Sequence, residues 1–128
     1  MKKLLSILAC ALFCSAIAIP SAFADVNVKP AMKSINTHFK AASSAKDISA
    51  LKTELIALRD AVKKTQAEVQ AVKQPSNDEK TYLDGMGKLL SEIDNSVTLA
   101  ETGKYDEAKA SLGKIKALRG EYHKKLGV

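Results

Sequence analysis

Apolar side chains recur at spacings of three and four along this chain, which is the period of an α-helix. The strongest stripe consists of Ile48, Leu51, Leu55, Leu58, Val62, Val69 and Val72. It stops before Pro75, and its heptad-like spacing favours packing at a small angle to neighbouring helices. The sequence has neither a period-two alternation nor an Asn-Gly hairpin signal, so the pattern predicts an all-α fold.

Three further segments have recognisable starts and stops. The first begins at Pro30, a residue favoured in the first helical turn, and the third follows Ser76 as its N-cap. Gly103 is placed to end the third, and the fourth runs from Tyr105 to a lysine-rich last turn. Their apolar positions are Met32, Ile35, Phe39 and Ala42; Tyr82, Leu83, Met86, Leu89, Leu90, Ile93, Val97 and Ala100; and Tyr105, Ala108, Leu112, Ile115, Leu118, Tyr122 and Leu126.

The links between the four segments are short, and short links make consecutive helices antiparallel neighbours. The expected architecture is therefore an antiparallel up-down-up-down four-helix bundle. In this topology the start of the first segment, the start of the third and the end of the fourth lie at the same end of the bundle.

Residues 1–24 have the three parts of a secretory signal peptide. Lys2 and Lys3 form a charged start, residues 4–19 an apolar stretch, and Ala22-Phe23-Ala24 a cleavage site. Cleavage would leave residues 25–128 as one four-helix-bundle domain of 104 residues. We expect this domain in the periplasm, with no membrane span after the signal peptide is removed.

Cysteine and charge narrow the function classes. Both cysteines, Cys10 and Cys14, lie in the predicted signal peptide, so the mature chain would contain no thiol. Without Lys2 and Lys3 the net charge falls from +6 to +4, and both signs are interspersed. With no basic run interleaved with aromatic residues, no nucleic-acid partner is expected. The small basic excess fits either an acidic partner or solvated helix faces.

Two residues with candidate metal chemistry fall at the same end of the expected bundle. Met32 lies near the start of the first segment and His123 near the end of the fourth. A thioether and an imidazole are the pair that holds haem iron in electron-transfer cytochromes. Taken singly, Met32 could also be an ordinary core residue, and His123 could be a structural or surface residue. Arg119, one turn before His123, fits either a carboxylate partner or a solvated charge.

Gly85 and Gly87 flank Met86 in the third segment, and each costs about 1 kcal/mol relative to alanine within a helix. They could leave room for a flat ligand, allow close helix packing, or simply be tolerated. Met86 is a thioether that could compete with Met32 for the ligand role, and it also fits a position in the core.

The chain resembles the cytochrome b562 family over essentially all of residues 25–128, and four stretches carry the resemblance most clearly. The run Leu118–Lys125 is similar to the family's Arg-x-x-Tyr-His-x-Lys motif. Residues 80–90 around Gly85, residues 100–104, and the Met-x-x-Ile start of the first segment are also similar. The chain departs from the family pattern at Tyr82 and Met86 in the third segment, and at Leu126-Gly127 after the histidine.

The resemblance implies a monomeric electron carrier with an unidentified periplasmic redox partner. It implies one non-covalent b-type haem (iron protoporphyrin IX) per chain, with Met32 and His123 as axial ligands. The implied cofactor-binding residues are Arg119, Tyr122, Ile35, Phe39, Met86 and Leu89. The chain has no C-x-x-C-H, the motif of covalent haem attachment.

Two other function classes are compared with this one. A haem-free periplasmic binding or adaptor bundle is the alternative, because the fold alone does not settle function. An enzyme is not expected. Glu121-Tyr122-His123 lacks the Glu-x-x-His spacing of a di-iron bundle, and the sequence shows no nucleophile–base pair or glycine-rich phosphate loop. The other histidine, His38, is expected to be a partly exposed residue on a helix.

Overall fold

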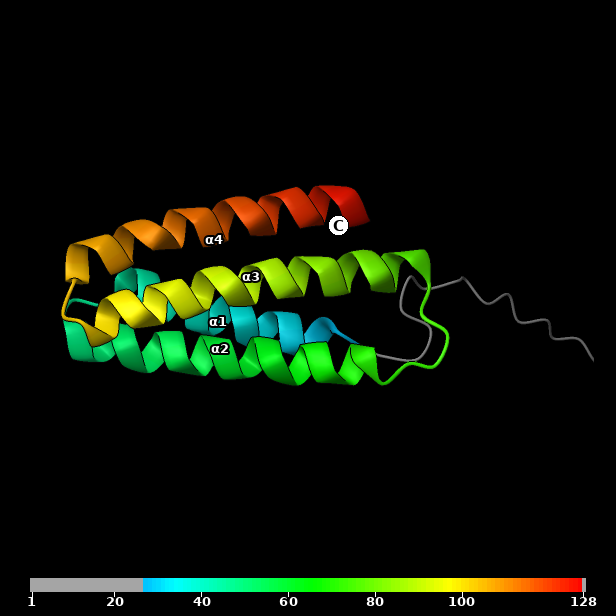
Figure 1. The fold of residues 1–128 in the computed structure, drawn as a ribbon, viewed down its shortest axis with the longest axis horizontal. Helices are drawn as coiled ribbons and strands as arrows, with labels where there is room; N and C mark the ends of the chain where they lie inside the picture. The colour runs from blue at the N-terminus through cyan, green and yellow to red at the C-terminus, as the bar shows by residue number, and fades with distance from the viewer. Residues whose placement is uncertain (1–26, 128) are drawn as a thin grey trace, which may run out of the picture.

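The computed structural model describes residues 27–127, which form a bundle of four helices joined by short links (Figure 1). The helices are α1 (Lys29–Ser44), α2 (Ile48–Gln70), α3 (Asn77–Glu101) and α4 (Tyr105–Leu126). Within these residues there is no strand, which confirms the prediction of an all-α fold. The signal peptide predicted for residues 1–24 lies outside the described part of the chain.

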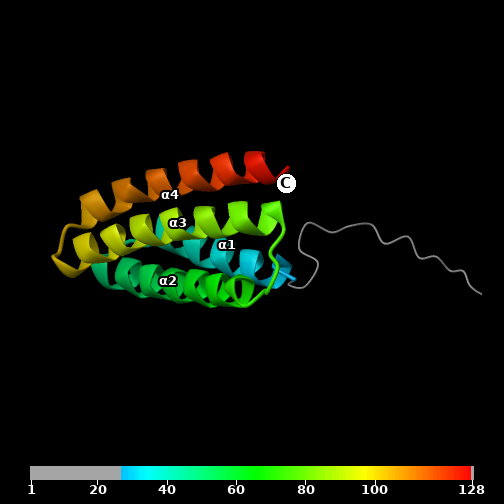
Figure 2. The same ribbon diagram turned by 45° about the vertical axis from the view of Figure 1, so that its right-hand side comes forward.

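The helices alternate in direction, as the short links predict. Figures 1 and 2 show the α1–α2 and α3–α4 links at one end of the bundle. The start of α1, the α2–α3 link and the end of α4 lie together at the other end. Helix α4 packs closely on α3, whereas it contacts α1 only sparsely. The bundle is therefore loosely closed along the seam between α1 and α4.

Local capping explains where α3 begins and ends. The Ser76 hydroxyl accepts a 3.1 Å hydrogen bond from the Glu79 backbone N–H. The Glu79 carboxylate accepts one of 3.1 Å from the Ser76 N–H, which completes a capping box. After α3, Gly103 adopts a left-handed φ of +77°, which a glycine does without strain. The N-cap and the glycine stop are where the sequence predicts them.

Helix α2 ends earlier than its apolar stripe predicts. The stripe extends to Val72, but the helix ends at Gln70 and Val72 lies half-buried in the link. Pro75 has no N–H and disfavours helical backbone in Gln74 before it, so it limits how far the helix could continue, and the helix ends four residues before Gln74.

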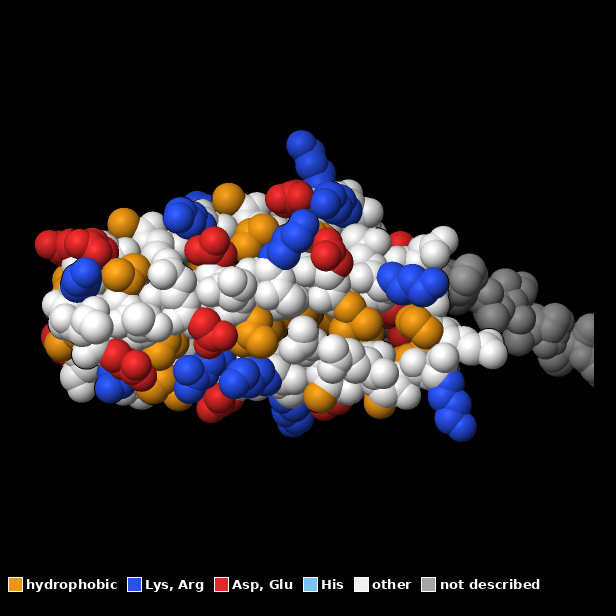
Figure 3. Space-filling model, viewed as in Figure 1, with side chains coloured by type: hydrophobic (Ala, Val, Ile, Leu, Met, Phe, Trp, Pro, Cys, Tyr) orange, Lys and Arg blue, Asp and Glu red, His pale blue; other side chains and the backbone are white. Residues whose placement is uncertain are grey.

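The centre of the bundle is a continuous apolar core. Its fully buried members are mostly on α2 and α3, among them Leu51, Leu55, Leu58, Val62 and Ile93. Acidic and basic side chains are interspersed on the face drawn in Figure 3. Among the described helices, none combines the length and the hydropathy that crossing a membrane requires.

Candidate functional site

An apolar pocket opens in the half of the bundle where α1 begins and α4 ends. It encloses about 590 Å³ of empty space, part of it continuous with solvent, and its surface is almost wholly apolar. All four helices contribute to its wall. The lining residues are Met32, Ile35, Phe39, Leu58, Tyr82, Gly85, Met86, Leu89, Ile115, Leu118, Arg119, Tyr122, His123 and Leu126. These include all eight residues predicted as a cofactor site, whose role toward a cofactor stays a prediction.

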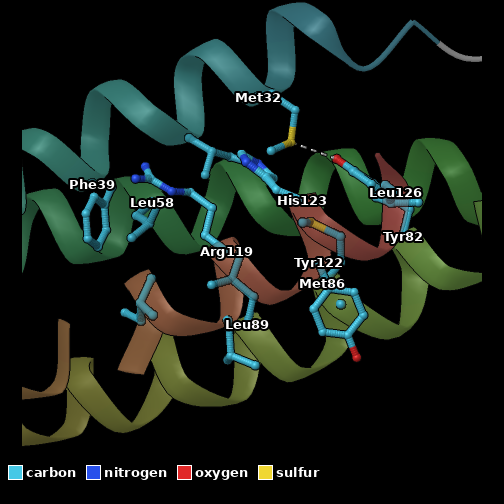
Figure 4. Close-up of a pocket in the computed structure, with 14 residues that line it drawn as sticks. Met32, Phe39, Leu58, Tyr82, Met86, Leu89, Arg119, Tyr122, His123 and Leu126 are labelled. Carbon is cyan, nitrogen blue, oxygen red and sulfur yellow. Dashed lines mark hydrogen bonds between the residues drawn. The ribbon is translucent and has the colours of Figure 1, made fainter. Parts of the chain in front are cut away.

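Met32 and His123 face this pocket from the two helices that pack least closely on each other. Met32 lies in the first turn of α1, where its N–H donates a 2.9 Å hydrogen bond to the Val28 carbonyl. His123 lies in the last full turn of α4, and both side chains are half-buried. Figure 4 shows them directed into the same space. The antiparallel topology has brought together two potential ligands that are 91 positions apart in the sequence.

Tyr82 of α3 contacts the sulfur of Met32. Its side chain is only 4% exposed, and its hydroxyl donates a 3.4 Å hydrogen bond to Met32 Sδ, the dashed line in Figure 4. Burial raises the pKa of the Tyr82 phenol well above its ordinary value, and a hydrogen bond with Thr65 opposes that rise. The hydroxyl is therefore neutral throughout the physiological range and serves as a donor to the thioether.

Arg119 is held against the pocket wall by two contacts with α1. Its Nη1 donates a 2.8 Å hydrogen bond to Asn36 Oδ1, and its guanidinium lies 5.2 Å from the centre of the Phe39 ring. This partly buried geometry differs from a freely solvated surface charge. It keeps one cation at the edge of an otherwise apolar pocket.

Tyr122 turns its ring toward the pocket and its hydroxyl toward solvent. The hydroxyl donates a hydrogen bond to the Asp84 carboxylate. This bond, with the nearby Lys88 ammonium, holds the pKa of Asp84 below its ordinary range. The ammonium groups of Lys88 and Lys125 lie 5.6 and 4.4 Å from the centre of the Tyr122 ring. Charged groups from α3 and α4 therefore fix the orientation of this ring.

The two glycines of α3 have different surroundings. A Cβ added at Gly85 would lie 2.7 Å from Cδ1 of Tyr122, so the ring packs directly on the glycine backbone. Close packing of α3 and α4 is thus a sufficient reason for Gly85, which also lines the pocket. A Cβ at Gly87 would come no closer than 4.0 Å to Gln66, and nothing in the structure requires a glycine there.

The second histidine lies away from the pocket. His38 Nδ1 is 2.8 Å from Glu54 Oε2 on α2, and its side chain is 32% exposed. The sequence predicted a partly exposed helix residue at this position, as found. The carboxylate partner on the neighbouring helix was not predicted.

Sequence reasoning did not assign several pocket residues to the site. Leu58 and Ile115 belong to apolar stripes, and stripes alone do not separate pocket positions from core positions. The sequence identifies Tyr82 as an apolar stripe position and as a departure from the family pattern, and not as a site residue. Asn36, the partner of Arg119, lies beside the stripe of its helix and carries no local signal.

Comparisons with known proteins agree with the geometry. Residues 27–126 match the protein family described as Cytochrome b562. A "Probable soluble cytochrome b562 2" of Yersinia pestis is 30% identical in an alignment of 128 positions that covers 97% of each chain. An uncharacterized protein of Pasteurella multocida (strain Pm70) is 29% identical in an alignment of 130 positions that covers 98% of each chain. The similarity thus extends over the whole bundle and is not confined to one motif.

Proposed function

Because this chain belongs to the cytochrome b562 family, and that family implies a haem cofactor, we propose that it is an electron-transfer protein with one non-covalent b-type haem. Met32 Sδ and an imidazole nitrogen of His123 would be the axial ligands. The observation that carries the proposal is their convergence in one apolar pocket between α1 and α4.

The pocket residues fit such a group chemically. A neutral thioether and a neutral imidazole are a ligand pair found in haem proteins that transfer electrons. The pocket's apolar wall suits a porphyrin face, and side chains from all four helices surround it.

The haem, when bound, supplies one-electron exchange between ferric and ferrous iron. With the iron held on both sides by Met32 and His123, no axial position would be left for a substrate. We therefore propose a carrier of electrons and not an enzyme. Thioether ligation favours the ferrous state, which raises the reduction potential.

Other pocket side chains have proposed supporting roles. Arg119 can exchange its contact with Asn36 for a haem propionate, since a guanidinium pairs well with a carboxylate. Ile35, Phe39, Met86 and Leu89 would contact the porphyrin, and the Tyr122 ring would close the wall over Gly85.

The proposed location is the periplasm, and the proposed partner is another periplasmic redox protein. The location is supported by the signal-peptide pattern of residues 1–24, whose structure is not described. The chain is proposed to act as a monomer, in keeping with a site built within a single bundle.

The test is an absorption spectrum of the purified full-length or naturally processed chain before and after dithionite. Sharp visible bands on reduction, unchanged by carbon monoxide, are expected for iron with both axial positions filled. His123→Ala should lose most of the haem, and Met32→Ala should keep a weaker, perturbed site. The matched control is His38→Ala, which removes an imidazole outside the pocket and should bind haem like the wild type. A folded wild-type protein that takes up no haemin would support the haem-free adaptor instead.

A further inference from the structure

The hydrogen bond between Tyr82 and Met32 joins two helices at the sulfur of a proposed iron ligand. Tyr82 extends from α3, and Met32 from α1 (Figure 4). The donor and acceptor are 3.4 Å apart, and the tyrosine is 4% exposed. A buried hydroxyl without a partner is costly, so this contact is favoured over an empty space beside the sulfur.

The direction of this hydrogen bond follows from chemistry. A thioether sulfur has no proton and can only accept, so the phenol must donate. The buried Thr65 hydroxyl also hydrogen-bonds with the phenol and acts to lower its pKa. Because a hydroxyl both donates and accepts, the phenol can donate its proton to Met32 while its oxygen accepts from Thr65.

A thioether sulfur has two lone pairs, so it can bind iron with one and accept a hydrogen bond with the other. We propose that Tyr82 is a positioning residue for Met32: it fixes the sulfur toward the pocket and, when the sulfur ligates iron, raises the reduction potential of the haem. This inference rests on the proposed function, because the tuning requires Met32 to be the ligand.

The sign of the effect follows from two contributions that act together. A hydrogen bond to the sulfur withdraws electron density that would otherwise stabilise ferric iron. The positive end of the hydroxyl dipole also faces the sulfur and disfavours the additional positive charge of the ferric state. Hydrogen bonds around a ligand are among the means by which a protein tunes a haem.

The test is Tyr82→Phe, which keeps the ring and removes the hydroxyl. Its control is Tyr105→Phe, because the Tyr105 hydroxyl donates a 2.7 Å hydrogen bond to the Ala45 carbonyl at the opposite end of the bundle. Reduction potentials are measured by spectroelectrochemistry of the haem-loaded proteins. The near-infrared band of methionine-ligated ferric haem reports whether Met32 still binds iron.

We expect Tyr82→Phe to keep that band. Its ferric–ferrous equilibrium constant should shift toward ferric iron by about three- to tenfold, which corresponds to the net free energy of one hydrogen bond. A tenfold change equals about 59 mV for a one-electron couple. Tyr105→Phe should match the wild type. A Tyr82→Phe potential equal to that of the wild type, with methionine ligation intact in both, would overturn the tuning role.

A second measurement uses the haem-free protein. A hydrogen bond occupies a sulfur lone pair, so peroxide should oxidise Met32 faster in Tyr82→Phe than in the wild type. The oxidation rate of Met86, read by mass spectrometry in the same samples, is the internal reference. Equal Met32 rates in the two proteins would overturn the hydrogen bond itself. A wild-type chain that takes up no haem overturns the proposed function and the tuning with it, whatever the peroxide rates show.

Discussion

Single side chains set the shape of the pocket wall, and Tyr122 illustrates how. Its ring lies on Gly85, where a Cβ would come within 2.7 Å, and its hydroxyl is drawn outward by Asp84. Lys88 and Lys125 lie over the ring. The Tyr122 ring, which lines the apolar pocket, is thus oriented by polar groups that lie outside the pocket. Substitutions at Gly85, Tyr122 or Asp84 should therefore change how α3 and α4 pack.

Gly85→Ala tests the close approach of the two helices. The added methyl group must displace the Tyr122 ring, which should cost about 1–3 kcal/mol of unfolding free energy. Gly87→Ala is the matched control, because the same change there has space and should stabilise the helix by up to about 1 kcal/mol. Urea denaturation of the haem-free proteins measures both. Finding Gly85→Ala as stable as Gly87→Ala would contradict the packing described.

The Asp84–Tyr122 hydrogen bond makes a pH-dependent contribution to the free energy of unfolding. The pKa of Asp84 is lowered in the folded state, first by the Tyr122 hydrogen bond and then by Lys88, relative to about 3.9 in an unfolded chain. The contact therefore stabilises the native state above that unfolded value, and its stabilisation is lost as the pH falls through the folded pKa.

Two measurements follow from that sign. In Tyr122→Phe, NMR titration should show the Asp84 pKa rising toward its ordinary value. In Asp84→Asn, urea midpoints should decline less than in the wild type as the pH is lowered through the carboxyl range. An Asp84 pKa that is the same with and without the Tyr122 hydroxyl would rule out this cause.

At the level of helices, the links and caps decide which residues meet at the pocket end. Helix α3 begins there with the Ser76–Glu79 capping box, one turn before Tyr82. Helix α1 begins there with Pro30 in its first turn but with no side-chain cap. The start of α3 is therefore fixed by local hydrogen bonds, which place Tyr82 relative to Met32.

Ser76→Ala should lower the free energy of unfolding by about 1 kcal/mol, because the Glu79 N–H loses its side-chain acceptor. The comparison is Ser91→Ala on the exposed face within α3, where alanine is at least as good a helix former. Thermal unfolding of both variants measures the difference. Equal losses in the two would mean that the cap contributes nothing.

At the level of the whole molecule, α4 packs on α3 and leaves the α1–α4 seam open around the pocket. A ligand held from both sides of that seam would connect the two helices that touch least. A ligand that binds only the native state also stabilises that state against unfolding. The gain is roughly 2.7 kcal/mol when the free ligand concentration is a hundred times the dissociation constant.

Haem addition should accordingly raise the thermal unfolding midpoint of the wild type. The rise should be much smaller in His123→Ala, which lacks one proposed ligand. His38→Ala should respond like the wild type, since its imidazole is bonded to Glu54 away from the pocket. Calorimetry with and without haemin measures the three midpoints. An equal rise in all three proteins would argue against His123 as the ligand.

The local sequence pattern alone predicts the helices of this protein and their arrangement. Helical period locates four helices, and Ser76 and Gly103 mark where α3 begins and ends. Short links then determine that Met32 and His123 meet at one end, because antiparallel neighbours alternate in direction. The pattern does not predict the end of α2 at Gln70, since an apolar stripe can continue past the last helical residue.

Tertiary structure alone decided how side chains meet across helices. The contacts of Tyr82 with Met32, of Tyr122 with Gly85 and of Arg119 with Asn36 depend on how each helix is rotated and how far it is shifted along its neighbour. The rotation and shift of each helix follow from packing of the whole core, and the spacing of residues along one helix does not reveal them. The sequence by itself thus determined the helices and their order, and packing determined the pocket and the partner of the Met32 sulfur.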